Sequence, residues 1–127
     1  MTPEIKPLVL IAEDDPFTRR LIEVTVKNAG YEVISVSDGE QALARICADR
    51  PALAILDVQM PRLTGWEVGK ELKTRLKDSP TRIIFLTSHT QERDVLEGFK
   101  AGATDYLFKP FSPRELKARI KAVLGRQ

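Results

Sequence analysis

Cysteine is almost absent from this sequence, since Cys47 is the only one in 127 residues. An intrachain disulfide is therefore excluded. A reducing compartment is favoured, because stable disulfides belong to oxidising compartments. Cys47 falls within an expected amphipathic helix, where we interpret it as a small core residue rather than as a reactive thiol.

Long apolar runs and an excess of one charge are also missing. No apolar run approaches the roughly 18–20 residues that span a bilayer, and the N-terminal segment lacks the layout of a signal peptide. We therefore expect a cytoplasmic protein without membrane contact. The formal net charge is only +2, from 20 basic and 18 acidic residues. Because the basic residues are spread over several expected helices, we predict no direct binding of nucleic acid.

What the sequence does contain is an alternation of short apolar runs with helical periodicity, in an ordinary globular composition. The expected strands are Leu8–Ala12, Glu32–Val36, Leu53–Leu56, Arg82–Thr87 and Asp105–Phe108. Four apolar stripes at helical spacing are Phe17, Leu21 and Val24; Val68, Leu72 and Leu76; Val95, Leu96 and Phe99; and Leu116, Ile120 and Val123. Asp15, Asp38 and Ser112 stand where helix N-caps are expected.

This alternation predicts an α/β fold with parallel strands, right-handed crossovers and helices on both faces of the sheet. For five strands we expect a doubly wound, flavodoxin-like (βα)5 sheet of order 2-1-3-4-5, with a crevice between the first and third strands. Nearly continuous apolar runs are typical of strands that are covered on both faces.

Acidic residues stand at the ends of the two strands that border this crevice. Glu13 and Asp14 follow the first strand, and Asp57 follows the run 53–56. Carboxylates that converge at one sheet edge repel one another, and the pKa of at least one should rise. A bound divalent cation would relieve this repulsion, so the pattern predicts a metal site.

Five motifs in order resemble the receiver domain of two-component response regulators. They are EDD (13–15), DVQMP with a glycine after it (57–65), LTS (86–88), GATDYLFKPF (102–111) and the closing SPREL helix. The resemblance covers about residues 7–125 and implies a single receiver domain over 1–127. It implies a phosphorylation-switched signalling module, a regulatory domain and not an enzyme, which catalyses only its own phosphorylation and autodephosphorylation.

The resemblance assigns the acidic residues individual roles. Asp57 corresponds to the phosphoacceptor, which receives a phosphoryl group from a sensor histidine kinase or a histidine phosphotransfer protein of a phosphorelay. Asp14 corresponds to a direct Mg²⁺ ligand and Glu13 to a ligand that acts through water. The Asp57 carboxylate and the Gln59 carbonyl correspond to the remaining protein ligands. Asp15 is interpreted as a helix cap.

The same resemblance assigns residues that bind and report the phosphoryl group. Lys109 corresponds to a charge on the phosphoryl oxygens, with a cis peptide bond to Pro110. Thr87 corresponds to the hydroxyl that moves to the phosphoryl group, and Ser88 to a small residue whose N–H faces it. Tyr106 corresponds to the aromatic switch that turns inward when Thr87 moves, which changes the surface of the fourth helix, the strand 105–108 and the last helix.

Three further residues receive more limited interpretations. Gln59 and His89 are at rim positions that tune the rate of dephosphorylation in the family. Trp66 is expected to pack on a helix surface or to face a partner.

A homodimer through the surface of the fourth helix, the strand 105–108 and the last helix is possible on the family pattern. Arg119 and Asp105 resemble a salt bridge of the transcription-factor branch. However, Val95 stands where that branch carries an arginine facing Glu115, so the dimer signature is incomplete.

Two other function classes are disfavoured. A phosphotransferase or phosphatase of the haloacid-dehalogenase type would need a second acid two residues after Asp57, where Gln59 stands. A nucleotide or flavin binder would need a glycine-rich loop after the first strand, where EDDPFT stands. About two residues follow the last expected helix, so we expect the output to come from a downstream effector or a fused output domain outside this chain. The cognate kinase stays open.

Overall fold

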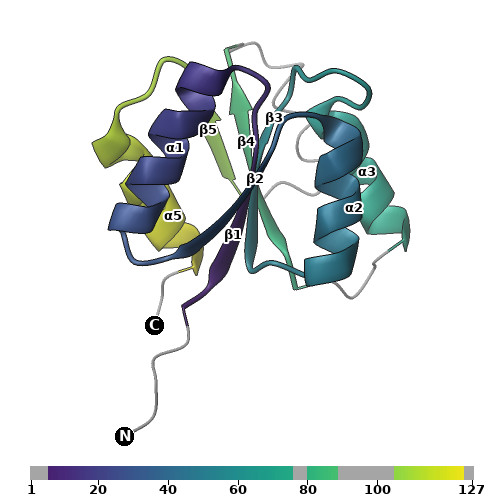
Figure 1. Ribbon diagram of the computed structural model, residues 1–127, viewed down its shortest axis with the longest axis horizontal. Helices are drawn as coiled ribbons and strands as arrows, with labels where there is room; N and C mark the ends of the chain where they lie inside the picture. Colours follow the sequence, from purple (N-terminus) through teal and green to yellow (C-terminus); the bar gives the residue numbers. More distant parts are fainter. Residues whose placement is uncertain (1–5, 76–79, 89–104, 125–127) are drawn as a thin grey trace, which may run out of the picture.

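The computed structural model describes residues 6–75, 80–88 and 105–124, and it contains a parallel sheet between two layers of helices (Figure 1). The strands are β1 (Leu8–Ala12), β2 (Glu32–Val36), β3 (Leu53–Asp57), β4 (Arg82–Thr87) and β5 (Asp105–Phe108). The helices are α1 (Pro16–Asn28), α2 (Gly39–Asp49), α3 (Gly65–Arg75) and α5 (Pro113–Leu124). The sheet order β2-β1-β3-β4-β5 confirms the predicted doubly wound topology.

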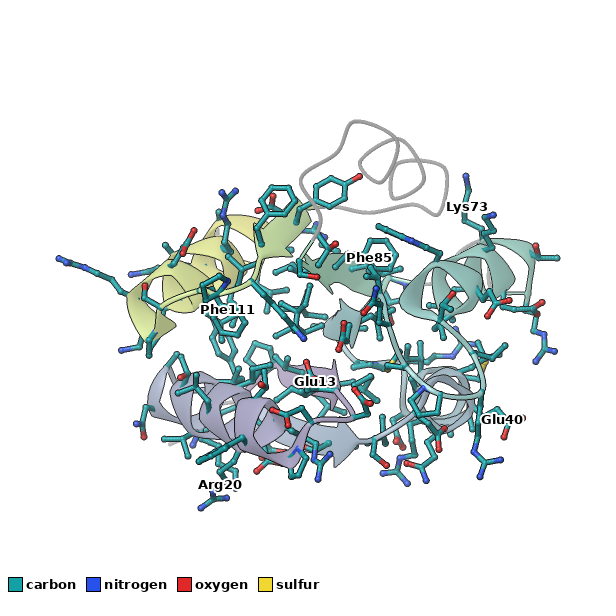
Figure 2. The ribbon with its side chains drawn as sticks, turned by 90° about the horizontal axis from the view of Figure 1, so that it is seen from above. Glu13, Arg20, Glu40, Lys73, Phe85 and Phe111 are labelled. Carbon is teal, nitrogen blue, oxygen red and sulfur yellow. The ribbon has the colours of Figure 1, made fainter. Side chains whose placement is uncertain are left out.

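The central strands are buried on both faces, as their nearly continuous apolar runs predicted. Every residue of β3 is buried, and its side chains alternate between two cores. One core lies between the sheet and helices α2 and α3, and the other lies between the sheet and helices α1 and α5 (Figure 1). Figure 2 shows Phe85 beside α3 and Phe111 between α5 and α1.

The strand register decides which side chains meet at the carboxyl edge of the sheet. Ala12 of β1 pairs with Leu56 of β3, so the residues that follow them, Glu13 and Asp57, lie level at the edge. Thr87 of β4 follows the partner of Asp57 and continues the same edge. The register therefore gathers the acidic residues of two strands at the switch point between β1 and β3.

The predicted N-caps of three helices are present. Asp15 Oδ2 accepts a hydrogen bond from the backbone N–H of Thr18 at 2.8 Å. Asp38 and Ser112 likewise accept from the N–H of the third residue of α2 and of α5. In the part of the chain that the structure describes, no helix has both the length and the apolar character needed to cross a membrane.

The apolar stripe predicted for α1 is wrong. Phe17, Leu21 and Val24 are 86%, 41% and 40% exposed, respectively. The helix instead buries the neighbouring stripe of Ile22, Thr25 and Val26. The Thr25 hydroxyl donates to the carbonyl of Leu21 at 2.8 Å, so a polar residue enters the core with its hydrogen bond made. The exposed stripe of Phe17, Leu21 and Val24 is called the α1 apolar patch below.

The other predicted stripes agree with the structure where it describes them. Leu116, Ile120 and Val123 of α5 are buried, as are Val68 and Leu72 of α3. Leu76 and the stripe at 95–99 lie outside the described residues.

Trp66 and Cys47 both pack against the core between the sheet and helices α2 and α3. The ring of Trp66 meets Phe85 edge-on, with 4.5 Å between the ring centroids. Trp66 is half-buried on α3, which agrees with the expected packing on a helix surface, and contact with a partner stays a prediction. Cys47 is also half-buried against this core, as predicted.

Candidate functional site

Three carboxylates converge at the switch point. Glu13, Asp14 and Asp57 each contribute one carboxylate oxygen, and these three oxygens lie within 4.8 Å of one another. They form part of a pocket of about 230 Å³, whose lining is completed by Asp15, Val58, Gln59, Ser88 and Lys109. Clustered carboxylate oxygens are the hard ligands that Mg²⁺ prefers, so the residues present fit this ion. The predicted meeting of the two strand ends is confirmed.

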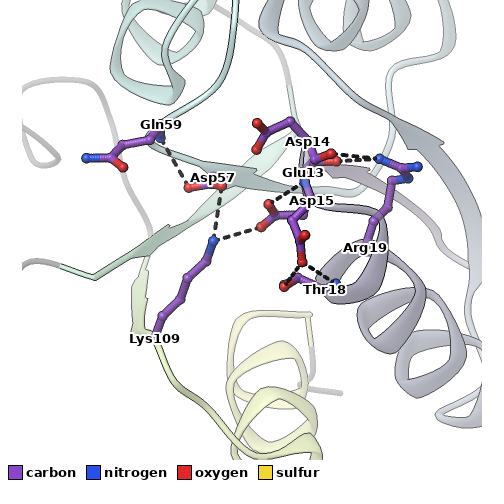
Figure 3. A network of polar contacts seen from close by, with 8 residues as sticks. All are labelled: Glu13, Asp14, Asp15, Thr18, Arg19, Asp57, Gln59 and Lys109. Carbon is purple, nitrogen blue, oxygen red and sulfur yellow. Dashed lines mark hydrogen bonds and ion pairs between the residues drawn. The ribbon is translucent and has the colours of Figure 1, made fainter.

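The three carboxylates differ in their exposure to solvent. Glu13 is 1% exposed and Asp57 is 4% exposed, whereas Asp14 is exposed. Figure 3 shows Glu13 and Asp57 in contact with Lys109, and it draws no such contact for Asp14. The site therefore has two buried acids and one acid that is open to solvent.

Lys109 joins the two buried acids. Its Nζ lies 2.9 Å from Glu13 Oε1 and 3.1 Å from Asp57 Oδ2 (Figure 3). The backbone N–H of Lys109 donates to the Thr87 carbonyl at 2.8 Å, which extends the β4–β5 ladder and fixes the start of this side chain. The peptide bond between Lys109 and Pro110 is cis, as the resemblance implied.

Backbone groups hold the remaining carboxylate oxygens. The N–H of Gln59 donates to Asp57 Oδ1 at 3.1 Å, and the N–H of Asp15 donates to Glu13 Oε2 at 3.1 Å. Arg19 of α1 donates to the Glu13 carbonyl at 2.9 Å, a contact that the sequence did not reveal. Each buried carboxylate thus accepts one backbone and one lysine hydrogen bond, which fixes its orientation.

The electrostatics of the pocket favour a proton on Glu13 when no cation is bound. Burial raises the pKa of Glu13 to about 7, the hydrogen bond from Lys109 opposes this rise, and the charge of Asp57 adds to it. For Lys109, burial lowers the pKa, but the hydrogen bond to Glu13 and the charge of Asp57 outweigh burial and raise it. The expected rise of one carboxyl pKa is confirmed, and Lys109 stays charged.

Gly65 brings the backbone of α3 directly behind Asp57. A Cβ at this position would lie 2.5 Å from the Asp57 carbonyl oxygen and 2.9 Å from the Cα of Val58. The N–H of Gly65 donates to the Val58 carbonyl at 3.1 Å. Only glycine allows this close approach without moving the backbone of Asp57, which explains the glycine after DVQMP.

The residues that the resemblance assigns to reporting lie at the end of β4 and on β5. Thr87 is buried at the end of β4, and Ser88 is exposed and lines the pocket. Tyr106 is half-buried on β5 and packs against the core on the α2 and α3 side. The exposed Gln59 lines the pocket. His89 lies outside the described residues, so its role at the rim stays a prediction.

The α1 apolar patch adjoins the acidic pocket. A second pocket, of about 370 Å³, connects them and is lined by Thr18, Leu21, Ser88, Lys109, Pro110 and Phe111. Sequence reasoning missed this surface because it assigned the apolar periodicity of α1 to the core. The apolar spacing of Phe17, Leu21 and Val24 was visible in the sequence, but it was assigned to the buried face of α1 instead of the exposed face.

The predicted ion pair at the far side of β5 is present. Arg119 Nη1 lies 3.2 Å from each carboxylate oxygen of Asp105. Glu115 is exposed, and Val95 lies outside the described residues. The homodimer through this surface stays a prediction.

The chain resembles known regulators over nearly its whole length. The model of the response regulator receiver domain matches residues 9–121. The protein named "Probable transcriptional regulator ycf27" of Porphyridium aerugineum is 43% identical over 121 residues, which are 95% of this chain and 49% of that protein. "Alkaline phosphatase synthesis transcriptional regulatory protein PhoP" of Bacillus subtilis is 42% identical over 118 residues, 93% of this chain and 48% of that protein.

The fold is also that of solved receivers. The chemotaxis response regulator CheY4 of Vibrio cholerae superimposes with a TM-score of 0.88 at 36% identity, over 94% of this chain and all of that one. The chain spans about half the length of the transcriptional regulators that it matches.

Proposed function

Because the chain belongs to the response regulator receiver family, and so is a regulatory protein of two-component signalling, we propose that Asp57 is its phosphoacceptor. The single observation that carries this proposal is the position of the Asp57 carboxylate. It is buried at the base of an acidic pocket, with one oxygen held by a backbone N–H and the other by Lys109. A fixed carboxylate that faces an open pocket is suited to in-line attack on phosphorus.

The phosphoryl donor in the proposal is a histidine kinase or a histidine phosphotransfer protein. A carboxylate oxygen of Asp57 forms a bond to phosphorus while the bond from phosphorus to the donor's imidazole nitrogen breaks, and that nitrogen keeps the electron pair. The product is an aspartyl phosphate. Lys109, which stays charged, is placed to contact the phosphoryl oxygens once they replace Asp57 as its partner.

Magnesium completes the proposed site. Asp14, Asp57 and the Gln59 carbonyl would hold the ion directly, and Glu13 would hold it through water. A bound Mg²⁺ would neutralise the carboxylates and so allow the anionic phosphoryl group to approach. The support for this assignment is the cluster of three carboxylate oxygens within 4.8 Å.

The proposed response to phosphorylation is a change of packing around β4 and β5. Thr87 and Ser88 would hydrogen-bond the phosphoryl group, and Tyr106 would turn toward the space that Thr87 leaves. The altered face would then control a downstream effector or a fused output domain, and it could serve as a homodimer surface. In support, Tyr106 is half-buried on β5, which pairs directly with β4, the strand that ends at Thr87.

The test of the acceptor is phosphorylation by a small donor. With acetyl phosphate and Mg²⁺, intact-mass spectrometry should show one added phosphoryl group on the wild-type chain and none on Asp57→Asn. Asp49→Asn, at the exposed end of α2, is the matched control and should be labelled like the wild type. Equal labelling of Asp57→Asn at another residue would refute the assignment.

We infer that the protein donor would dock on the α1 apolar patch. A donor that places its imidazole over Asp57 must cover the rim of the acidic pocket, and Leu21 lines the pocket that joins this rim to the patch. An exposed phenylalanine beside a polar site is a common component of an interface. Leu21→Ser should therefore slow phosphoryl transfer from a protein donor severalfold and leave labelling by acetyl phosphate unchanged. Equal slowing with both donors would contradict a docking role.

A further inference from the structure

Helix α5 carries most of its positive charge without an acidic partner. Of its four cations, Arg119 is paired with Asp105 of β5. The other three, Arg114, Lys117 and Lys121, are exposed, and no carboxylate within the described ranges lies at ion-pair distance from them. One cation of α5 is therefore neutralised by an ion pair, and the other three are available to a ligand.

These three side chains line one groove. It has a volume of about 420 Å³ and lies between α5 and the turn that follows α1; its lining is completed by Ala29, Tyr31 and Ala118. The α5 positions 114, 117, 118 and 121 recur at helical spacing and so share one face. Tyr31 is half-buried and packs against the core beneath α1 and α5, which gives the groove a fixed apolar floor. This site is called the α5 basic groove.

The stability of α5 does not account for all of these cations. Lys121 lies in the last turn, where a cation interacts favourably with the helix dipole. Arg114 is the second residue of the helix, and at that end the dipole disfavours positive charge. The helix dipole therefore gives Arg114 no stabilising role at this position, and its charge lies on the rim of the groove.

We propose that the α5 basic groove binds an extended acidic segment of a partner protein. Arg114 and Lys121 are separated by about 10 Å along the helix. Four residues of extended chain span about 13 Å, a distance that the long Arg114 and Lys121 side chains can match. Two carboxylates four residues apart lie on one face of an extended segment and would therefore meet both ends of the groove. An apolar side chain midway between them shares that face and would lie over Tyr31 and Ala118, with Lys117 beside it.

A peptide fits the groove better than a nucleic acid does. Strong binding of a phosphate backbone uses about six to ten cations, whereas this groove offers three, on a chain whose net charge is +2. The floor is also made of small and half-buried side chains, and no exposed aromatic ring is available there for stacking a base. The site lies apart from the acidic pocket and does not depend on the acceptor role of Asp57.

The test uses the full chain and a defined probe. The probe is a short fluorescein-labelled peptide with two aspartates four residues apart and a leucine midway between them, and its binding is followed by fluorescence anisotropy at low salt. Lys117→Glu/Lys121→Glu should weaken binding by about tenfold or more, since two attractions become repulsions. The matched control is Lys70→Glu/Lys73→Glu on α3, which covers the other face of the sheet (Figure 2). It should change the affinity by less than about twofold.

Two further measurements decide the nature of the site. Replacing the leucine of the probe by serine should weaken binding severalfold because the apolar floor loses its contact. Equal weakening by the two double variants, or no effect of the leucine, would overturn the proposal in favour of diffuse electrostatic attraction. Tighter binding of a single-stranded oligonucleotide of equal charge, with the same response to Lys117→Glu/Lys121→Glu, would overturn it in favour of a nucleic-acid site.

Discussion

The acidic pocket and the α1 apolar patch depart from the usual distribution of residues in opposite ways. The pocket buries Glu13 and Asp57 with Lys109, although charged side chains are almost never fully buried unless they are paired. The neighbouring patch leaves Phe17 86% exposed, beside Leu21 and Val24. The two regions share a bordering pocket, so the departures occur at one end of the molecule. Their shared position is what the proposed docking of a phosphoryl donor at Asp57 requires.

The largest expected effect contrasts the two faces of α1. Ile22 is fully buried on this helix and Phe17 is exposed. Ile22→Ala should lower the free energy of unfolding by about 2–5 kcal/mol, because it removes buried methyl groups and leaves a cavity. Urea denaturation followed by circular dichroism measures this change. A loss smaller than about 1 kcal/mol would mean that the buried face of α1 is assigned to the wrong residues.

The next effect concerns the buried carboxyl of Glu13. Its pKa rises from 4.5 to about 7 on folding. Between these pH values the unfolded chain loses its proton first, so the contribution of Glu13 to stability is present below about pH 4.5 and is lost as the pH rises through 7. Glu13→Gln keeps the neutral form, so at pH 8 without Mg²⁺ it should be more stable than the wild type by about 3 kcal/mol.

The measurement is the free energy of unfolding of both proteins from pH 5 to pH 8 in the presence of a chelator. The difference between them should grow with pH and level off above pH 7. Two curves that run parallel across this range would show that Glu13 titrates normally. Burial in the acidic pocket would then not raise the pKa of this carboxyl.

A smaller effect is expected for the exposed acid beside it. Asp14→Asn should weaken Mg²⁺ binding by about tenfold, because it removes an anionic direct ligand. Its unfolding free energy without Mg²⁺ should change by less than about 0.5 kcal/mol, as expected for an exposed position. Glu13→Gln should weaken Mg²⁺ binding less, since its contact passes through water. Isothermal titration calorimetry at pH 8 gives these affinities, and a reversed order would exchange the roles of the two acids.

The smallest effect on stability is expected at the patch itself. Phe17→Ala should change the free energy of unfolding by no more than about 0.5 kcal/mol, because the ring is already in solvent. Denaturation measured beside Ile22→Ala provides the control on the same helix. A loss comparable to that of Ile22→Ala would show that the ring is packed, and that the patch is part of the core.

Sequence patterns predicted the sheet because each strand is marked by its own apolar run, and their strict alternation leaves few topologies. The meeting of Glu13 with Asp57 followed from that order alone. The position of Lys109 did not, because its partners lie 52 and 96 residues away in the sequence and only the family resemblance indicated them. The face of α1 was misjudged because a buried threonine counts as polar in any periodicity argument, although its hydroxyl is satisfied within the helix.

The edge-on contact between Trp66 and Phe85 gives the protein an intrinsic fluorescence reporter. Trp66 is the only tryptophan of the chain, so indole fluorescence comes from a single position. Trp66 follows Gly65, which touches the backbone of Asp57, and Phe85 lies two residues before Thr87 on β4. A shift of the end of β3 at Asp57 or of β4 at Thr87 would alter the surroundings of the indole. We therefore expect the proposed phosphorylation or Mg²⁺ binding to change the intrinsic emission, which a fluorescence titration of the unlabelled protein would detect.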